Sequence, residues 1–275
     1  MNQSLTFTII QTNLHWEDKR LNLNMLENKI SSINEKTEIV VLPEMFSTGF
    51  SMHAEELAET MDGETVQWMK RIAAEKKIIL TGSVIITEMD QTALARPRYY
   101  NRLIWMLPNG QYGIYDKRHQ FAYAGEDAEF TAGSKRLIAS VKGWKINLFV
   151  CYDLRFPVWA RQQVQERALE YDVLVYVANW PDKRIHAWKT LLQARAIENQ
   201  CYVVGVNRVG DDGNNIHYSG ESMIVDAMGE VLYSRKEVED VFTIQLNKDH
   251  LNSVREKLPF WKDADGFQIL NDGED

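Results

Sequence analysis

Runs of consecutive apolar residues recur along the chain, and between some of them the apolar residues follow a helical period instead. A short apolar run rich in β-branched residues predicts a buried strand, whereas spacings of three and four residues predict a helix with one buried face. The runs that predict strands are residues 5–11, 38–42, 78–87, 99–107, 111–117, 137–141, 145–150, 172–178, 201–207, 217–226, 230–234 and 241–246. The stretches that predict helices are residues 18–33, 65–76, 158 to about 171, and 186–198.

The details of this pattern give further expectations. Leu21, Leu23, Leu26 and Ile30 are expected on the buried face of the first helix. Residues 119–135 have no period and predict a long loop, and long loops inside compact domains are often functional.

The order of the elements predicts a single domain over residues 1–275. Strands recur from residue 5 to residue 246 without a linker or an internal repeat. They are enough for two sheets packed face to face, with helices on the outer sides, which is an α/β architecture. Residues 258–275 form a tail of aromatic and acidic residues, expected to dock on the surface or on a partner subunit. The last four residues are expected to be loose.

Composition narrows the class of protein. Of the 275 residues, 45% are hydrophobic and 25% are charged, which is ordinary for a soluble globular protein. The net charge of −8, without a run of Lys and Arg, argues against a nucleic-acid or anionic-membrane partner. Residues 1–10 lack the pattern of a signal peptide, and no apolar run approaches the roughly 20 residues of a membrane span.

The chain has two cysteines, Cys151 and Cys201. A disulfide framework is therefore not expected, and a reduced cytoplasmic setting fits. Neither cysteine has a CxxC partner or a nearby histidine pair, so no zinc site is expected. Cys201 lies within a predicted strand and is expected to be buried and inert.

Cys151 stands where a buried strand is expected to turn into a helix. The carboxyl ends of strands are where open α/β sheets place their chemistry. The positive end of the predicted helix is expected to lower the pKa of the thiol and favour thiolate, as a nucleophile requires. The alternative is a small buried side chain with no chemical role.

Two more reactive side chains follow apolar runs in the same way. Glu44 comes after the strand at 38–42, and Lys117 after the strand at 111–117. Together with Cys151 they could form one site, in which the carboxylate is a general base, the thiol a nucleophile and the ammonium a stabiliser of an oxyanion. Taken singly, Glu44 could be an exposed loop acid and Lys117 a solvated surface lysine.

At these positions the sequence resembles the nitrilase, or carbon–nitrogen hydrolase, superfamily. The matching segments are LPEMFSTGF around Glu44, YDKRHQF around Lys117, VCYDLRFP around Cys151, HAWKTLLQARAIENQ and HYSGESMIVDAMGEVL. The resemblance implies a four-layer αββα sandwich of two mixed sheets, a Glu-Lys-Cys triad and a homodimer. It also implies a second catalytic glutamate between the lysine and the cysteine, for which Glu126 matches best and Glu129 less well.

The resemblance implies hydrolysis of a small amide without metal or organic cofactor. Glu44 would take the proton of Cys151, while Lys117 and the backbone N–H of Tyr152 hold the oxyanion; water would then release the acid from a thioester. The segments ANWP, SGESMIVDAMGE and PFWKDAD resemble the bacterial ω-amidase branch, whose members hydrolyse dicarboxylic monoamides such as 2-oxoglutaramate. The alternatives are an N-carbamoyl amino acid or aliphatic amide as substrate, or a catalytically dead binding protein.

Several neighbouring residues have weaker expectations. Phe46, Phe121 and Trp180 could form the wall of an apolar substrate slot together with Tyr152, although aromatic side chains are more often core.

Polar residues near the cysteine are also open to more than one interpretation. Asp153 and Arg155 are expected to pair and hold the cysteine turn, with Arg155 as an alternative anchor for a substrate carboxylate. His119 and His186 are expected to be structural, because the lysine and glutamates supply the chemistry.

Overall fold

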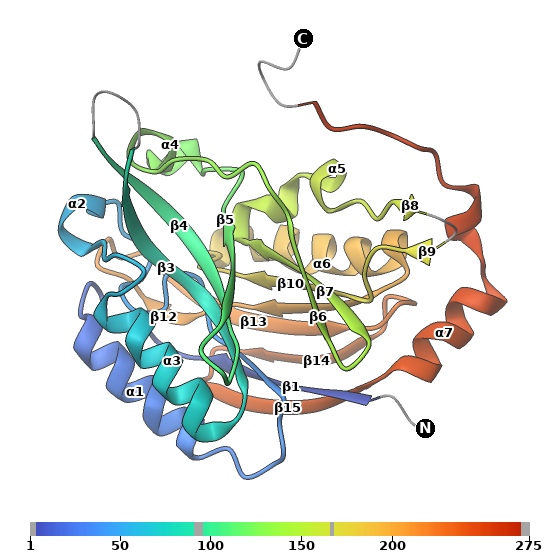
Figure 1. The fold of residues 1–275 in the computed structure, drawn as a ribbon, viewed down its shortest axis with the longest axis horizontal. Helices are drawn as coiled ribbons and strands as arrows, with labels where there is room; N and C mark the ends of the chain where they lie inside the picture. Colours follow the sequence, from blue (N-terminus) through green and yellow to red (C-terminus); the bar gives the residue numbers. More distant parts are fainter. Residues whose placement is uncertain (1–3, 91–95, 166–167, 271–275) are drawn as a thin grey trace.

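The computed structural model describes residues 4–90, 96–165 and 168–270. Two mixed β-sheets lie at its centre (Figure 1). The first has the strand order β15-β1-β2-β3-β4-β5. Its strands are β1 (Ser4–Gln11), β2 (Ile39–Val41), β3 (Ile79–Met89), β4 (Pro97–Met106), β5 (Tyr112–Asp116) and β15 (Asp240–Asn247). Neighbours β1, β2 and β3 are parallel, and the other pairs are antiparallel.

The second sheet has the order β12-β13-β11-β10-β7-β6, with β14 paired to β13. Its strands are β6 (Leu137–Val141), β7 (Trp144–Val150), β10 (Val173–Val177), β11 (Tyr202–Val206), β12 (Val209–Asp211), β13 (His217–Val225) and β14 (Val231–Lys236). Strands β7, β10 and β11 are parallel neighbours, so their carboxyl ends meet at one edge. Cys151 and Asn179 therefore leave the sheet on the same side.

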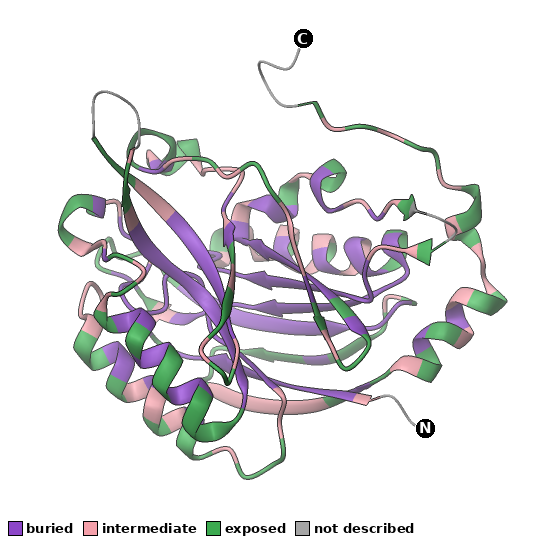
Figure 2. Ribbon diagram, viewed as in Figure 1, coloured by how far each residue is buried: buried purple, intermediate pink, exposed green. Residues whose placement is uncertain are grey.

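Helices cover the outer faces of both sheets, which gives the predicted αββα layers (Figure 1). Helices α1 (Lys19–Ser31) and α3 (Glu64–Lys76) lie on the first sheet, and α5 (Pro157–Ala160) and α6 (Ile185–Asn199) on the second. Side chains of β1 pack alternately on its two faces. Phe7 packs with the second sheet, and Ile10 packs with α1 and α3. Figure 2 shows central strands such as β3, β7 and β10 buried between the layers, whereas β14 and the outer sides of α1 and α3 are exposed.

Shorter elements connect these layers. They are α2 (Ala54–Leu57), α4 (Glu126–Glu129), α7 (Lys248–Lys257), β8 (Val164–Gln165), β9 (Ala168–Leu169) and the 3₁₀ turns η1 (Ala122–Ala124), η2 (Cys151–Arg155), η3 (Asp182–Arg184) and η4 (Phe260–Asp263). The predicted loop at 119–135 thus contains η1 and α4. Strand β12 and helix α7 were not predicted.

The long helix predicted from residue 158 to about 171 is wrong. Only the four residues of α5 are helical, and β8 and β9 pair as a short hairpin; residues 166 and 167 lie outside the described residues. Gln162 explains the break, because its backbone N–H and side chain donate to Asn199 (2.8 and 2.6 Å) and its side-chain oxygen accepts from the Tyr171 N–H (2.8 Å). These tertiary hydrogen bonds replace those of a continued helix.

One residue of the first helix is also misplaced by the prediction. Leu23, Leu26 and Ile30 are buried, but Leu21 is 49% exposed. Asn22 takes the buried place instead, because its side chain donates to the carbonyls of His15 and Ser47 (2.7 and 2.9 Å). A buried polar side chain with satisfied hydrogen bonds has no hydrophobic signal in the sequence.

The start of the tail is held to the body of the protein. Gln200 donates to the Leu258 carbonyl (2.7 Å) and accepts from the Trp261 N–H (3.2 Å), and Ile269 packs at the margin of the core. Residues 271–275, which include the four expected to be loose, lie outside the described residues. Among the helices that the structure describes, none has the length and apolar character needed to cross a membrane.

Candidate active site

The backbone at Cys151 is bent sharply between β7 and the 3₁₀ turn η2. Cys151 has a φ of +44°, a left-handed conformation that is costly for a residue with a side chain. Asp153 holds this bend, since its Oδ2 accepts a hydrogen bond from the Val150 N–H (3.0 Å). The thiol lies at the carboxyl edge of the second sheet, 3.9 Å from the Asn179 carbonyl oxygen. Stored strain of this kind is a feature of functional sites.

Lys117 lies between two buried glutamates. Its Nζ donates to Glu44 Oε1 (3.0 Å) and to both oxygens of Glu126 (2.8 and 2.7 Å). The side chains of all three are fully buried. The predicted convergence of Glu44 and Lys117 is therefore present, and Glu126, not the exposed Glu129, is the glutamate that contacts the lysine.

Two asparagines that the sequence analysis missed hold these carboxylates. Asn101 Nδ2 donates to Glu44 Oε1 (2.8 Å) and to Glu126 Oε1 (3.2 Å). The Asn179 N–H donates to Glu44 Oε2 (2.8 Å), and its side chain donates to the Glu44 carbonyl (2.6 Å). Asn101 is a polar residue inside the apolar strand β4, and Asn179 follows β10, so the sequence marks both positions but not their partners.

Burial and the charges of these side chains set the pKa of each group. Burial raises the pKa of Cys151 well above its usual value, and the negative charge of Glu44 raises it further, although Lys117 opposes this. Burial alone would lower the pKa of Lys117, but the charges of Glu126 and Glu44 outweigh it and raise the pKa. Burial raises the pKa of Glu126.

The pKa of the thiol therefore contradicts the prediction from the helix dipole. The element after Cys151 is a short 3₁₀ turn, so it lacks the aligned peptides of a long helix. The thiol is protonated at rest and requires a neighbouring base to become a thiolate. Glu44 is placed to do this, because its carboxylate lies close enough to the thiol for its negative charge to raise the pKa of Cys151.

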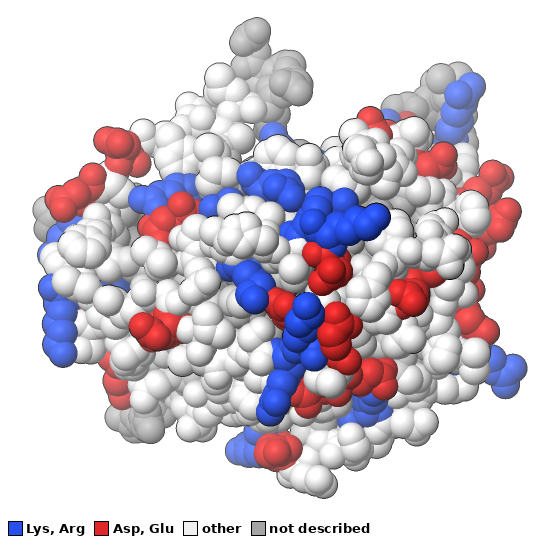
Figure 3. All heavy atoms as spheres, turned by 180° about the vertical axis from the view of Figure 1, so that it is seen from behind, with Lys and Arg blue, Asp and Glu red and all other residues white. Residues whose placement is uncertain are grey.

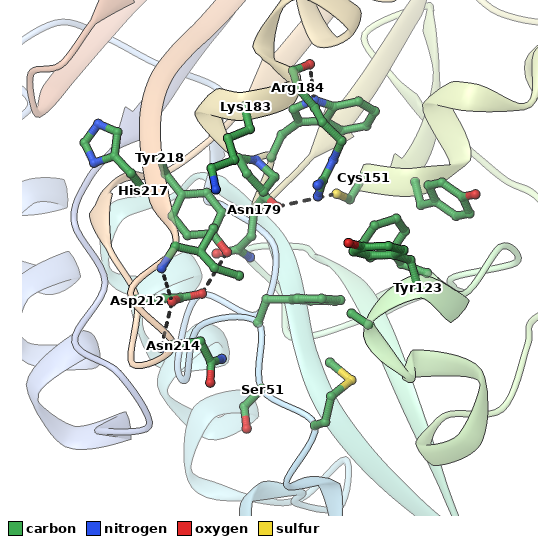
Figure 4. Close-up of a pocket in the computed structure, with 18 of the residues that line it drawn as sticks. Ser51, Tyr123, Cys151, Asn179, Lys183, Arg184, Asp212, Asn214, His217 and Tyr218 are labelled. Atoms are coloured by element: carbon green, nitrogen blue, oxygen red, sulfur yellow. Dashed lines mark hydrogen bonds between the residues drawn. The ribbon is translucent and has the colours of Figure 1, made fainter.

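A cavity of about 710 Å³ opens onto Cys151 and Lys117 (Figure 4). Phe121, Tyr152 and Trp180 line it, as the sequence analysis expected. The rings of Phe121 and Tyr152 meet edge to face with centroids 5.0 Å apart. The aromatic wall thus stands directly beside the reactive groups.

Phe46 does not belong to this wall. It is fully buried in the core beneath α1 and α3, with its ring 5.9 Å from that of Trp68. Met45 has a φ of +43°, and this turn takes the chain after Glu44 away from the cavity. Phe50 and Trp16, which the sequence analysis did not single out, line the cavity instead.

The predicted pair of Asp153 and Arg155 does not form. Asp153 accepts from the Tyr115 hydroxyl (2.7 Å) and from the His119 N–H (3.1 Å), and lies 2.8 Å from His119 Nδ1. Arg155 extends to the cavity and lies over the Trp180 ring, 5.0 Å from its centroid. His119 is thus part of the support of the cysteine turn.

The remaining candidates lie away from the reactive groups. His186 is exposed at the beginning of α6. Cys201 is buried in the core 3.9 Å from the Arg195 carbonyl oxygen, and burial raises its pKa.

The arrangement can carry out covalent catalysis at a carbonyl group. A buried thiol, a carboxylate that can accept its proton and an ammonium that can stabilise an oxyanion converge at one cavity. Each comes from a different strand end, and two sheets contribute to the site.

Comparisons with known proteins agree with this geometry. The family described as carbon-nitrogen hydrolase matches residues 6–256. The ω-amidase YafV of Yersinia enterocolitica is 41% identical over 97% of this chain and 99% of that protein. The 2-oxoglutaramate amidase of Bacillus subtilis is 31% identical over 94% of this chain and 96% of that protein. The crystal structure of XC1258 from Xanthomonas campestris, a CN-hydrolase superfamily protein, has a TM-score of 0.91 at 40% identity, covering 97% and 99% of the two chains.

Proposed function

Because the chain belongs to the carbon–nitrogen hydrolase family, it is an amidohydrolase, and we propose that it is an ω-amidase of dicarboxylic monoamides such as 2-oxoglutaramate. The observation that carries the proposal is the set of Glu44, Lys117 and Glu126 buried beside the thiol of Cys151. The two amidases described above support this substrate class. A cytoplasmic setting is part of the proposal, since both cysteines are free thiols.

The reaction begins with transfer of the thiol proton from Cys151 to Glu44. The thiolate attacks the amide carbonyl carbon, and the oxyanion that forms is held by Lys117 and the backbone N–H of Tyr152. Glu44 then gives its proton to the amide nitrogen, the C–N bond breaks and ammonia leaves. The acyl group remains on the sulfur as a thioester.

Water completes the cycle. Glu44 takes a proton from a water molecule, and the oxygen of that water attacks the thioester carbon. The C–S bond breaks, the sulfur of Cys151 regains a proton and the free acid leaves. Glu126 acts in both halves by holding Lys117, which it contacts with both oxygens.

A panel of small amides tests the proposal. Purified protein should release ammonia from 2-oxoglutaramate and succinamate faster than from an N-carbamoyl amino acid or an uncharged aliphatic amide. Cys151→Ala should abolish release from all of them. Faster turnover of the N-carbamoyl compound would assign a different specificity to the same site.

Labelling of the thiol separates an enzyme from a dead binding protein. Iodoacetamide should modify Cys151 stoichiometrically near neutral pH, and succinamate should protect it. An unreactive thiol together with no ammonia release would contradict the proposal.

A further inference from the structure

We infer that Arg184 binds the carboxylate at the far end of the substrate, and thereby selects dicarboxylic monoamides over simple amides. The inference rests on the proposed function. Arg184 is the last residue of η3, and Figure 4 shows its side chain and that of Lys183 extending from this turn into the cavity that holds the Cys151 thiol.

The charge of the buried reactive groups makes such a cation necessary. Glu44 and Glu126 are balanced by one ammonium, that of Lys117, while the thiol is neutral at rest. A substrate that carries a carboxylate thus approaches groups with an excess of one negative charge. Like charges repel more strongly in a water-poor cavity than in bulk solvent. A cation further out in the cavity has to offset this repulsion.

In the part of the chain that the structure describes, three cations of the cavity form no ion pair, although Asp182 and Asp212 also line it. Arg155, Lys183 and Arg184 all line it, and within the described ranges none of the three has a carboxylate oxygen within 4.0 Å. This is unusual in a chain with a net charge of −8. On the back of the molecule, basic and acidic side chains are interspersed (Figure 3). Unpaired cations gathered in one cavity of an acidic protein favour an anionic ligand.

Arg184 is the best placed of the three. It is half-buried, whereas Arg155 and Lys183 are exposed, and burial strengthens its attraction for an anion. Its guanidinium lies 5.0 Å from the centroid of the Phe121 ring. Phe121 in turn packs against Tyr152, the neighbour of the nucleophile, and its N–H donates to Glu126 Oε2 (2.6 Å). A guanidinium held beside a ring can still present two N–H donors to a carboxylate.

The segment that carries Arg184 is rigidly tied to the reactive groups. Its first residue, Asn179, donates to Glu44, and Trp180 Nε1 donates to the Arg184 carbonyl (2.8 Å). Asn207 fixes the middle, since its Oδ1 accepts from the Trp180 N–H (2.8 Å) and its Nδ2 donates to the Trp180 carbonyl (3.0 Å). The separation between the attacked carbon and the anion site is therefore set by the fold, which makes chain length a criterion of selection.

Substitution of Arg184 by Gln tests the inference with two substrates. With succinamate, kcat/KM should fall about 10- to 100-fold, mainly through KM, because a charge-assisted hydrogen-bonded pair is lost. With butyramide, which has the same carbon chain without the carboxylate, kcat/KM should stay within about twofold. Arg184→Lys keeps the positive charge but not the two parallel N–H donors of the guanidinium, so its kcat/KM with succinamate should lie between those of the wild-type protein and Arg184→Gln. Succinate should also bind less tightly, by a similar factor, to Arg184→Gln in a Cys151→Ala background.

Matched variants supply the outcomes that would overturn the inference. Arg155→Gln and Lys183→Gln should each affect succinamate less than Arg184→Gln does. An equal loss with succinamate and butyramide would show that Arg184 is only structural. A selective loss in Arg155→Gln instead would move the carboxylate site to Arg155. If the wild-type protein itself cleaves no dicarboxylic monoamide, the proposed function fails; if it does and Arg184→Gln is unselective, only this inference fails.

Discussion

At the level of single residues, the order in which protons move is fixed by the charge around the thiol. The pKa of Cys151 is raised by burial and then by Glu44, so a free thiolate is not the resting species. The same carboxylate that disfavours the thiolate is the group that accepts its proton. Nucleophile and base therefore act as a pair, and removing one changes the titration of the other.

Glu44→Gln should change the acidity of the Cys151 thiol and the turnover of substrate in opposite directions. The substitution removes a negative charge that raises the pKa of Cys151, so the thiol should titrate at lower pH than in the wild-type protein. Turnover of succinamate should nevertheless fall, by about 100- to 10,000-fold, because the proton acceptor is gone. Ultraviolet absorbance of the thiolate across pH and ammonia release measure the two effects. A thiol that titrates at higher pH in the variant would contradict this view of Glu44.

Two glutamates of one helical turn provide a second comparison. Glu126 is buried against Lys117, whereas Glu129, three residues later, is exposed. Glu126→Gln should lower kcat about 10-fold or more, although less than the roughly 100- to 1,000-fold that loss of an oxyanion donor itself can cost. Glu129→Gln should leave kcat unchanged. Steady-state kinetics of both variants decide, and an equal effect would remove Glu126 from the site.

The sequence revealed the charged residues of the site better than the neutral ones. Glu44, Lys117 and Cys151 each follow an apolar run, a pattern that packing alone does not explain. Phe46 was misplaced because the left-handed residue Met45 turns the chain, and such a turn has no signature when glycine is absent. The role of Asn101 depends on Glu44, which lies 57 positions away, and the periodicity of the sequence gives no information on such pairs.

At the level of elements, the turn η2 depends on one buried carboxylate. Asp153 accepts hydrogen bonds from Val150, Tyr115 and His119, which belong to three segments of the chain. These bonds hold the strained backbone of Cys151 in its left-handed conformation.

Asp153→Asn should therefore loosen the turn. The free energy of unfolding should fall by about 1.5–3 kcal/mol, because charge-assisted hydrogen bonds are lost and an amide N–H₂ now faces donors. Tyr115→Phe removes one hydrogen bond of the same carboxylate, together with the bond that the hydroxyl accepts from Trp159 Nε1 (3.0 Å), and should cost about 1–3 kcal/mol. Urea denaturation measures both, and kcat should fall more in Asp153→Asn. Equal and small losses would show that the turn keeps its conformation without Asp153.

The helices and strands also show where the prediction of the fold succeeded. Strands such as β7 and β10 were predicted to within one residue, because a buried parallel strand is a continuous apolar run. The helix expected after Pro157 failed because its apolar residues were read as a buried face, yet Val158 is 56% exposed. Tertiary hydrogen bonds through Gln162 decide that segment, and local pattern carries no information on them.

At the level of the whole molecule, the site exists only when both sheets are packed together. Glu44 and Lys117 follow strands of the first sheet, and Cys151 and Asn179 follow strands of the second. The aromatic and aliphatic core between the sheets thus sets the distances in the site. Anything that braces the outer layers against each other also supports the reaction geometry.

We expect a second copy of the chain to stabilise this packing by forming a homodimer. Helices α5 and α6 lie side by side on the second sheet, where Arg161 donates to the Glu198 carbonyl. They expose Val158 and Ile197, which are 56% and 54% accessible. Apolar side chains of this kind on adjacent helices suit an isologous contact between two copies. Sedimentation should give a mass of twice the 31.9 kDa of one chain.

A pair of substitutions locates this contact. Ile197→Asp should weaken the dimer by about 10-fold or more, because the contact would have to bury an unpaired carboxylate. Leu21→Asp places the same change on α1, where the leucine is 49% exposed on the opposite outer layer, and should leave the dimer intact. Sedimentation velocity over a dilution series compares the two. A wild-type monomer, or equal dissociation of both variants, would show that α5 and α6 do not form the interface.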